Sequence, residues 1–328
     1  MSKVKIAVIG TGHLGSIHAK LWKENADAEL CGVFDTDQAK SEQVAKNFDC
    51  KKYELLEQAI DEADALTIAV PTSLHFEIAS KCMIMGKHCL IEKPITANYI
   101  EAKKLIEEAQ IRNIIIQVGH VERFNPALLA IKSYEINPLF IEAHRLSQFK
   151  PRAIDVSVIH DLMIHDIDII LWLIKSKVKS IDADGVGVLT DNIDIANARI
   201  KFVNGAVANL TASRISASPM RKMRIFQKDA YLSLDFANQE VEVFRLLEEG
   251  ASPGDLGIPA TMLGSIDLGV KNKNIYYERP PVPTLNAIAE EQKSFIEAIN
   301  GNNVVPVGAE EAAEALRIAE EITAKIGK

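Results

Sequence analysis

A chain of 328 residues is longer than one typical domain and has enough length for two domains with separate hydrophobic cores. A hydrophobic fraction of 48% and a charged fraction of 25%, without repeats or low-complexity tracts, exclude disordered and fibrous classes. The 37 basic and 45 acidic residues give a net charge of −8, which disfavours nonspecific nucleic-acid binding through phosphate contacts.

The N-terminus and the cysteines indicate where the protein works. The apolar run in MSKVKIAVIGTG is shorter than the roughly 7 to 15 residues of a signal peptide core, and no other run approaches the ~18 that span a membrane. The four cysteines contain no C-x-x-C pair, so reduced thiols are expected in place of a disulfide framework or a zinc finger. We therefore expect a soluble, cytoplasmic protein without nucleic-acid or membrane partners.

The first 120 residues alternate short apolar runs with longer amphipathic ones. In chain order these are KIAVIG, a helix from about Leu14, AELCGVFD, a helix over DQAKSEQVAKNF, and then ALTIAVP, HFEIASKCMIMG, HCLIEKP, ANYIEAKKLIEEAQI and NIIIQVGH. Apolar strands separated by helices favour a parallel sheet covered on both faces. The sequence predicts an α/β fold whose residues 1–120 form a doubly wound, Rossmann domain.

The pattern changes in residues 121–328, which we expect to form an α+β domain. Alternating runs between Asp194 and Arg245, with Asn204-Gly205 as a hairpin turn, predict an antiparallel meander. The stretch 249–283 has weak periodicity and predicts long loops with one strand. Two amphipathic helices are expected near the end of the sequence, at Asn286–Ile299 and Glu310–Ile326. These helices can pack back on the first domain.

A glycine-rich turn follows the first predicted strand. Its G-x-G-x-x-G spacing allows a tight turn, close approach of the backbone to a pyrophosphate and close helix packing. The helix that follows offers its N-terminal N–H groups to an anion. We expect this turn to bind a dinucleotide, against the alternative of a turn without a ligand, through Gly10, Thr11, Gly12, His13, Leu14 and Gly15.

Asp35 ends the second predicted strand, about 20 residues after the third glycine. A carboxylate at this place accepts hydrogen bonds from both ribose hydroxyls and repels a 2′-phosphate. No Arg follows it in TDQAK, so NAD is the expected cofactor, although Lys40 leaves NADP open.

Two further segments end predicted strands, where a doubly wound sheet presents its ligand crevice. AVPTSLH supplies Pro71, Thr72 and His75 as candidate cofactor contacts, and LIEKP supplies Glu92 and Lys93. A lone His on a loop is also common as a packing residue. A lysine between a buried strand and a proline is hard to explain as a solvated residue, and its ammonium can stabilise a developing alkoxide.

These motifs, with the spacing of Asp161 and His165, resemble the glucose-fructose oxidoreductase / inositol dehydrogenase / MocA family (Gfo/Idh/MocA). The resemblance implies a C-terminal α+β domain whose large open sheet, mainly antiparallel, joins subunits into a homodimer or homotetramer. It also implies dehydrogenation of pyranoses or cyclitols, with Lys93 matching the lysine of the family's EKP motif and Asp161 and His165 its D-x-x-x-H pair. The residues VSVIH stand where the family often has glycines, so the entry to this helix is expected to differ.

A narrower likeness comes from VGHVERFNPA together with DLMIHDIDI. These runs resemble the branch that oxidises nucleotide-activated amino sugars, particularly UDP-N-acetylglucosamine at C3, for an aminotransferase of the lipid A pathway. Branches acting on free sugars carry similar segments, so a free-sugar or cyclitol dehydrogenase is the alternative. Arg123 and Asn125 then contact substrate, or else pin the crossover and cap a helix near Pro126.

Four basic residues of the predicted meander are candidates to meet a UDP diphosphate, or else form the solvated face of a strand; these are Arg214, Arg221, Lys222 and Arg224.

The stretch IHDLMIHDID, Ile159 to Asp168, concentrates His and Asp. With about 100° per residue of an α-helix, Asp161 lies roughly 40° from His165 and roughly 20° from Asp168, so the three share one face. His160 and Asp166 then point elsewhere, for packing or capping, which disfavours a metal site. A structural role of all three at a domain interface is the alternative.

The chemistry follows as a hypothesis. His165 acts as the general base on a sugar hydroxyl, Asp161 orients that imidazole or binds a neighbouring hydroxyl, and Lys93 stabilises the alkoxide. Substrate contacts are thus expected from Lys93, Arg123, Asn125, Asp161 and His165. A regulator that binds NAD without turnover is a competing class, but a pure sensor has no need of such a base.

Overall fold

The computed structural model describes residues 3–149, 156–248, 251, 258–267 and 272–327. Its contacts divide the chain into two compact units, Met1–Phe124 with Leu285–Arg317, and Asn125–Thr284 with Ile318–Lys328. A domain boundary after residue 120 stays a prediction.

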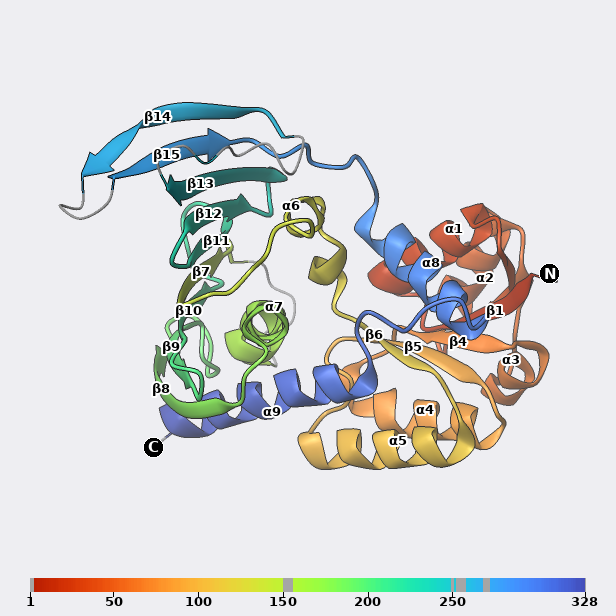
Figure 1. Cartoon of the computed structure of the whole chain (residues 1–328). Coiled ribbons are helices and arrows are strands. Elements are labelled where there is room, and N and C mark those ends of the chain that lie inside the picture. Colours follow the sequence, from red (N-terminus) through yellow and green to blue (C-terminus); the bar gives the residue numbers. More distant parts are fainter. Residues whose placement is uncertain (1–2, 150–155, 249–250, 252–257, 268–271, 328) are drawn as a thin grey trace. The chain divides into compact units, whose positions relative to one another are not determined.

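The first unit contains the predicted parallel sheet, with strand order β3-β2-β1-β4-β5-β6 (Figure 1). All its strand pairs are parallel, so the α/β prediction is confirmed. The elements are β1 (Val4–Ile9), α1 (His13–Glu24), β2 (Ala28–Phe34), α2 (Gln38–Phe48), β3 (Lys51–Lys52), α3 (Leu56–Glu62), β4 (Ala65–Ile68), α4 (His75–Ile84), β5 (His88–Glu92), α5 (Tyr99–Arg112), β6 (Ile116–Gly119) and α8 (Ala287–Ile299).

Strand β1 shows why the central strands are apolar throughout. Ala7 and Ile9 pack into one hydrophobic cluster, whereas Ile6 and Val8 pack into another. Successive side chains of a strand point to opposite faces, so both faces of this sheet are covered. The prediction from the sequence missed β3 and α3, which are too short to show a period.

The second unit is built on a mixed sheet, which in the described residues has strand order β14-β15-β13-β12-β11-β7-β10-β9-β8 (Figure 1). Only the pair β7 and β10 is parallel among these neighbours. The elements are α6 (Pro126–Ala130), β7 (Phe140–Leu146), α7 (Ile164–Ile174), β8 (Val178–Val186), β9 (Ile195–Phe202), β10 (Val207–Ser213), β11 (Met220–Phe226), β12 (Ala230–Asp235), β13 (Glu240–Glu248), β14 (Ala260–Asp267) and β15 (Asn272–Glu278); α9 (Ala309–Ile326) contributes to both units.

The hairpin at Asn204-Gly205 is confirmed. It joins β9 to β10, and Gly205 has a φ of 92°, which glycine adopts without steric cost. The expectation of a single strand in 249–283 is wrong, since β14 and β15 pair there as an antiparallel edge. Residues 249–250, 252–257 and 268–271 of that stretch lie outside the described residues. Strands β7 and β8 were also not predicted.

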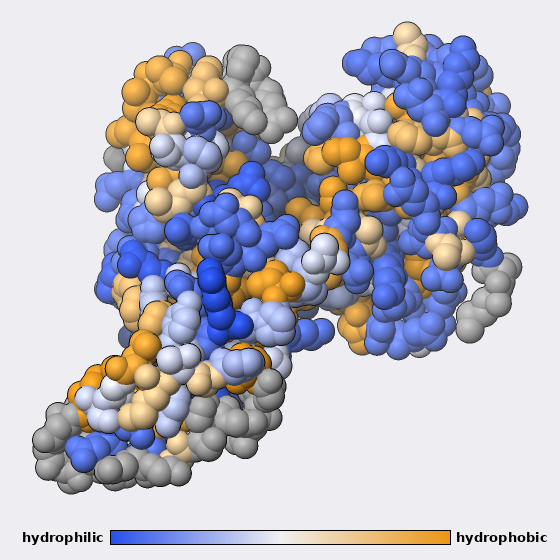
Figure 2. Space-filling view, turned by 90° about the horizontal axis from the view of Figure 1, so that it is seen from above, coloured by the Kyte–Doolittle hydropathy of each residue, from blue (hydrophilic) through white to orange (hydrophobic). Residues whose placement is uncertain are grey.

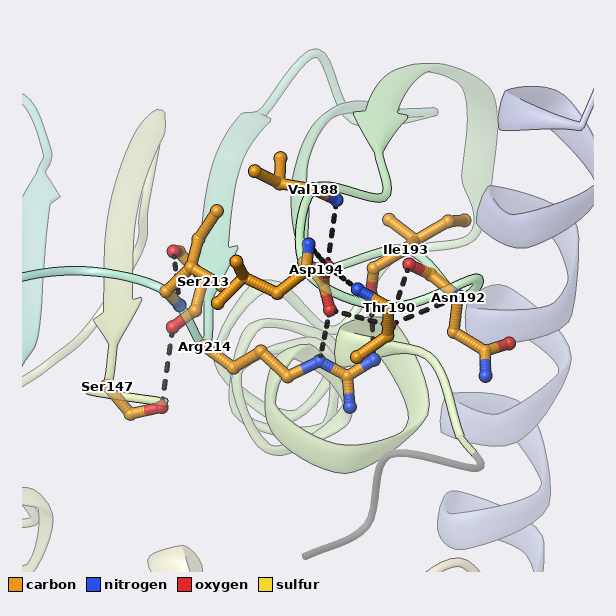
Figure 3. Close-up of polar contacts among 10 residues, drawn as sticks. Ser147, Val188, Thr190, Asn192, Ile193, Asp194, Ser213 and Arg214 are labelled. Atoms are coloured by element: carbon orange, nitrogen blue, oxygen red, sulfur yellow. Dashed lines mark hydrogen bonds and ion pairs between the residues drawn. The ribbon is translucent and has the colours of Figure 1, made fainter. Parts of the chain in front are cut away.

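Asp194 is a fully buried carboxylate that organises the turn before β9 (Figure 3). Its Oδ2 accepts the backbone N–H groups of Val188, Leu189 and Thr190 at 2.7 to 2.9 Å. Its Oδ1 accepts the Thr190 hydroxyl and the Arg214 Nε–H, both at 2.8 Å. Burial alone raises the pKa of Asp194, but these donors hold it well below its usual value.

We expect Asp194→Ala to lower the free energy of unfolding by about 3–5 kcal/mol, because it leaves a buried guanidinium and several N–H groups without their acceptor. Because the native pKa is lowered, the carboxylate contributes this stability at neutral pH and loses it only as pH falls through the native pKa. Urea denaturation at two pH values measures both effects. Asp191→Ala, on the exposed side of the same turn, is the control and should stay within about 0.5 kcal/mol of wild type.

Candidate active site

The glycine turn joins β1 to α1 as the spacing predicts. Gly10 has a φ of 92°, and a Cβ there would lie 2.4 Å from the Ala69 carbonyl oxygen. A Cβ on Gly15 would lie 1.8 Å from the Gly10 carbonyl oxygen, so a side chain is excluded at both places. At Gly12, the N-cap of α1, a Cβ would meet no atom within 4 Å. This open cradle fits a pyrophosphate approaching the backbone.

Asp35 lies at the end of β2 and contacts the glycine turn directly. Its Oδ2 accepts the backbone N–H of Thr11 at 2.6 Å and the Thr11 hydroxyl at 2.9 Å. Its Oδ1 accepts the Asp37 N–H at 2.9 Å. A carboxylate has further lone pairs, so the same group can accept ribose hydroxyls. Sequence reasoning missed the bond to Thr11, because two residues 24 positions apart show no shared pattern.

The loop after β4 supplies Pro71 and Thr72 at a short 3-10 turn, Thr72–Leu74. His75 is only 1% exposed, and its ring nitrogens lie 2.9 Å from the Pro94 carbonyl oxygen and 3.0 Å from that of Val70. Burial lowers the pKa of this imidazole. His75 therefore lies between a carbonyl oxygen of the loop after β4 and one of the loop after β5, and its ring N–H donates to one of them in the neutral form.

Glu92 and Lys93 lie at the end of β5, with Lys93 half-buried and its bond to Pro94 cis. Glu92 Oε1 lies 2.9 Å from His18 Nε2, and Oε2 accepts the Lys93 N–H at 3.2 Å. Although burial alone raises the pKa of Glu92, the hydrogen bond with His18 and the charge of Lys93 hold it below its usual value. The Glu92 side chain is thus engaged within the protein, beside the Lys93 backbone.

The helix that carries Asp161 and His165 is not α-helical throughout. Residues Ile159–Met163 form a π-helical turn, and the Ile164 N–H donates to the Ile159 carbonyl oxygen five residues back. The expected 40° between Asp161 and His165 assumed α geometry, so it does not apply across this wider turn. The D-x-x-x-H spacing is the same in both helix types and cannot distinguish them.

Asp161 and His165 are half-buried, whereas Asp168 is only 1% exposed. His160 Nδ1 lies 3.0 Å from the Ser157 hydroxyl. Asp166 does more than pack or cap, because Arg145 of β7 donates to both its carboxylate oxygens, Nε to Oδ2 at 2.9 Å and Nη2 to Oδ1 at 2.8 Å. This buried bidentate pair fixes α7 against the sheet.

The two VERFNPA candidates occupy different settings. Arg123 is 7% exposed, in the 3-10 turn Val121–Phe124. Asn125 is the N-cap of α6: its Oδ1 accepts the Ala127 N–H at 3.0 Å and its Nδ2 donates to the Phe236 carbonyl oxygen at 3.2 Å. The capping alternative is therefore confirmed for Asn125.

The four candidate diphosphate ligands differ in their burial and in their partners within the protein. Arg214 is buried, and its Nε and Nη2 bond Asp194 and the Ile193 carbonyl oxygen (Figure 3), so those groups are engaged within the protein. Lys222 pairs with Asp235 at 3.2 Å, and Arg224 pairs with Glu142 at 2.6 Å. Arg221, Lys222 and Arg224 are exposed on β11, as the solvated-face alternative describes.

Neither a metal site nor a membrane span is found in the part of the chain that the structure describes. No group of three His, Cys, Asp or Glu side chains there is arranged to hold a metal ion. Within the same ranges, no helix combines the length and apolar composition needed to cross a membrane.

The parallel sheet, the open glycine turn and Asp35 define a dinucleotide-binding Rossmann unit. The model of the Gfo/Idh/MocA oxidoreductase family, NAD-binding Rossmann fold, matches residues 4–120, and the model of the Gfo/Idh/MocA C-terminal domain matches residues 99–233. The chain belongs to the Gfo/Idh/MocA family of oxidoreductases, and the resemblance noted in the sequence is confirmed.

Individual relatives span the whole chain or most of it. The chain is 39% identical over 306 residues to UDP-N-acetylglucosamine 3-dehydrogenase of Acidithiobacillus ferrooxidans, covering 93% of this chain and 95% of that protein. A solved structure of that enzyme superposes with a TM-score of 0.88 at 35% identity, over 99% of this chain and 98% of the other. The chain is also 32% identical over 237 residues to scyllo-inositol 2-dehydrogenase (NAD(+)) of Bacillus subtilis, covering 65% of this chain and 68% of that protein.

We expect Asp35→Ala to weaken NADH binding about 10- to 100-fold, because a charged acceptor is lost from the glycine turn and from the ribose. NADPH affinity should fall less, since removal of the carboxylate also removes repulsion of a 2′-phosphate. Fluorescence titration with both cofactors measures the change. The matched control is Asp37→Ala, two residues on, whose exposed side chain caps α2 and should leave NADH affinity within about twofold. Equal affinities of wild type and Asp35→Ala would contradict this role.

Proposed function

We propose that this protein is an NAD-dependent dehydrogenase that oxidises the C3 hydroxyl of UDP-N-acetylglucosamine. The observation that carries the proposal is the 39% identity to a UDP-N-acetylglucosamine 3-dehydrogenase along 93% of this chain. The open cradle at Gly12 and the place of Lys93 at the end of β5 support it. Its 3-keto product is a substrate for an aminotransferase of the lipid A pathway.

The choice of NAD over NADP rests on Asp35. Its carboxylate would lie beside the ribose that carries the extra phosphate of NADP, and like charges repel. Lys40, the basic residue that follows Asp35 in TDQAK, forms an ion pair with Asp37, with Nζ 3.1 Å from Oδ2. Cofactor contacts are proposed for the glycine turn, Asp35, Pro71 and Thr72, with His75 and Glu92 supporting those loops.

The residues of the chain prepare the substrate. His165 accepts the proton of the sugar hydroxyl as general base, and Asp161 orients this imidazole or binds a neighbouring hydroxyl. The Lys93 ammonium stabilises the alkoxide that forms. Bound between the glycine turn and Asp35, NAD would supply the hydride acceptor. Arg123 and Asn125 are proposed substrate contacts, although the Asn125 amide already caps α6.

A second candidate is dehydrogenation of a free cyclitol or sugar. It is favoured by the 32% identity to a scyllo-inositol dehydrogenase, which covers 65% of this chain. The same Lys93, Asp161 and His165 would serve, since a secondary hydroxyl is oxidised in either case. The two candidates differ in whether a nucleotide is needed for recognition.

We also propose that the enzyme is a cytoplasmic homodimer or homotetramer joined through the open sheet. Five rings form a ladder across one face, with neighbouring centroids 4.9 to 6.0 Å apart: Phe140, Phe226, Tyr231, Phe244 and Tyr277. Figure 2 shows hydrophobic and hydrophilic residues mixed on the side of the molecule that carries β14 and β15. Four free cysteines agree with reducing surroundings.

We expect Lys93→Met and His165→Asn to lower kcat by about 10² to 10⁴ while leaving NADH affinity near that of wild type. Each substitution removes a group assigned to the chemical step and keeps a side chain of similar size. Stopped-flow turnover with a parallel NADH titration measures both quantities. Near wild-type turnover by either variant would remove the role assigned to that residue.

A panel of UDP-sugars and free sugars with NAD and NADP tests the substrate. We expect reduced cofactor to form with UDP-N-acetylglucosamine and NAD, and to accumulate when an aminotransferase consumes the ketone. N-Acetylglucosamine without the nucleotide is the matched control and should react far more slowly. Turnover of free sugars alone would replace the proposed substrate with the cyclitol alternative.

A further inference from the structure

A polar network within the first unit contacts the backbone of Lys93. Glu92 joins the backbone of Lys93 to His18 of α1, and His18 in turn contacts Gln292 of α8. His18 is 1% exposed and Gln292 is fully buried. A chain of contacts thus runs from α8 through α1 to the carboxylate next to Lys93.

The contacts of Gln292 determine the state of His18. The Gln292 Nε2 lies 3.1 Å from the His18 carbonyl oxygen and 3.2 Å from His18 Nδ1. A carbonyl oxygen only accepts and an amide NH₂ only donates, so Nδ1 must present a lone pair to Gln292. The ring hydrogen is then on Nε2, which donates to Glu92 Oε1 at 2.9 Å. Gln292 therefore selects the tautomer that binds Glu92.

Two carboxyl groups near this network have pKa values shifted in opposite directions. Glu291, the neighbour of Gln292 on α8, is 1% exposed, and burial together with the charge of Glu92 raises its pKa well above the usual value. Glu92 itself has a lowered pKa, and its carboxylate accepts from the donors of His18 and Lys93.

The opposite side of Glu92 is equally confined. Gly119 of β6 pairs with Glu92, and a Cβ there would lie 2.9 Å from Glu92 Oε2. The carboxylate is therefore held between a donor on α1, the Lys93 N–H and the backbone of a neighbouring strand. Few other positions are open to the carboxylate. Because it accepts the Lys93 N–H, the backbone of Lys93 is restricted as well.

We infer that Gln292 and His18 are positioning residues for Lys93, acting through Glu92. The inference rests on the proposed function, in which Lys93 stabilises the alkoxide. A stabilising charge works only when it is held where negative charge develops, and a displacement of about 1 Å can cost about 10²-fold in rate. A network that fixes the residue before Lys93 supplies such placement.

Gln292→Met tests the inference, because it keeps the side-chain volume and removes the donor to His18. We expect kcat to fall about tenfold while KM and NADH affinity stay within about twofold, since binding groups are untouched. The Lys93 amide resonance in ¹H–¹⁵N spectra should also move, because its acceptor Glu92 is no longer held by one His18 tautomer.

Gln117→Met is the matched control. Gln117 is a fully buried amide on β6 that donates to the Glu291 carbonyl oxygen at 2.7 Å and accepts from Ser294 at 3.1 Å. It joins the same helix to the sheet, and its side-chain hydrogen bonds go to Glu291 and Ser294, not to His18 or Glu92. This variant should lower stability but keep kcat and the Lys93 resonance of wild type.

His18→Gln and His18→Leu provide a second pair. Gln keeps an N–H donor for Glu92 and should retain more of kcat than Leu. The inference is overturned if Gln292→Met keeps both kcat and the Lys93 resonance, or if Gln117→Met lowers kcat equally. Should the wild type oxidise no sugar of the panel, the proposed function fails, while the Lys93 resonance still decides whether Gln292 acts on Lys93.

Discussion

The parallel pairing of β1 with β2 on one side and β4 on the other is the constraint on which the candidate site depends. Parallel strands end at one edge of a sheet, so the glycine turn, Asp35 and Lys93 emerge together although the chain separates them widely. Hydrogen bonds then connect the loops at this edge. Asp35 binds Thr11 after β1, and His75 binds the loop after β5. The proposed cofactor residues are therefore linked to the loops of neighbouring strands.

Carboxylates with little or no exposure hold several segments of the chain in place, with Asp194 and Asp166 buried and Glu92 13% exposed. Asp194 organises the turn before β9, Asp166 holds α7 to β7 through Arg145, and Glu92 holds the backbone at Lys93. An ionised group is costly to bury unless several donors satisfy it. Each of these carboxylates has at least two donors, so the charge becomes a rigid link between elements.

Much of this fold can be predicted from local sequence patterns, and the errors of the prediction concern short segments and single contacts. The apolar strands, the G-x-G-x-x-G turn and the Asn204-Gly205 hairpin follow from period and turn chemistry. The strand β3 and the pair β14 and β15 have no clear period of their own, because pairing with a neighbour makes them strands. The role of Asp166 depends on Arg145, 21 residues earlier, which no periodicity indicates.

The sequence by itself determined the class of fold, the family and most residues of the candidate site. Those features depend on residue type, spacing and period, which can be read directly from the sequence. Only the tertiary structure decided that His75, Arg214 and Asp166 are engaged within the protein, that Asp161 lies in a π-helical turn, and that Gln292 reaches Lys93 through His18 and Glu92. Hydrogen bonds form between groups that are close in space, so a partner 274 positions away cannot be recognised from the local sequence.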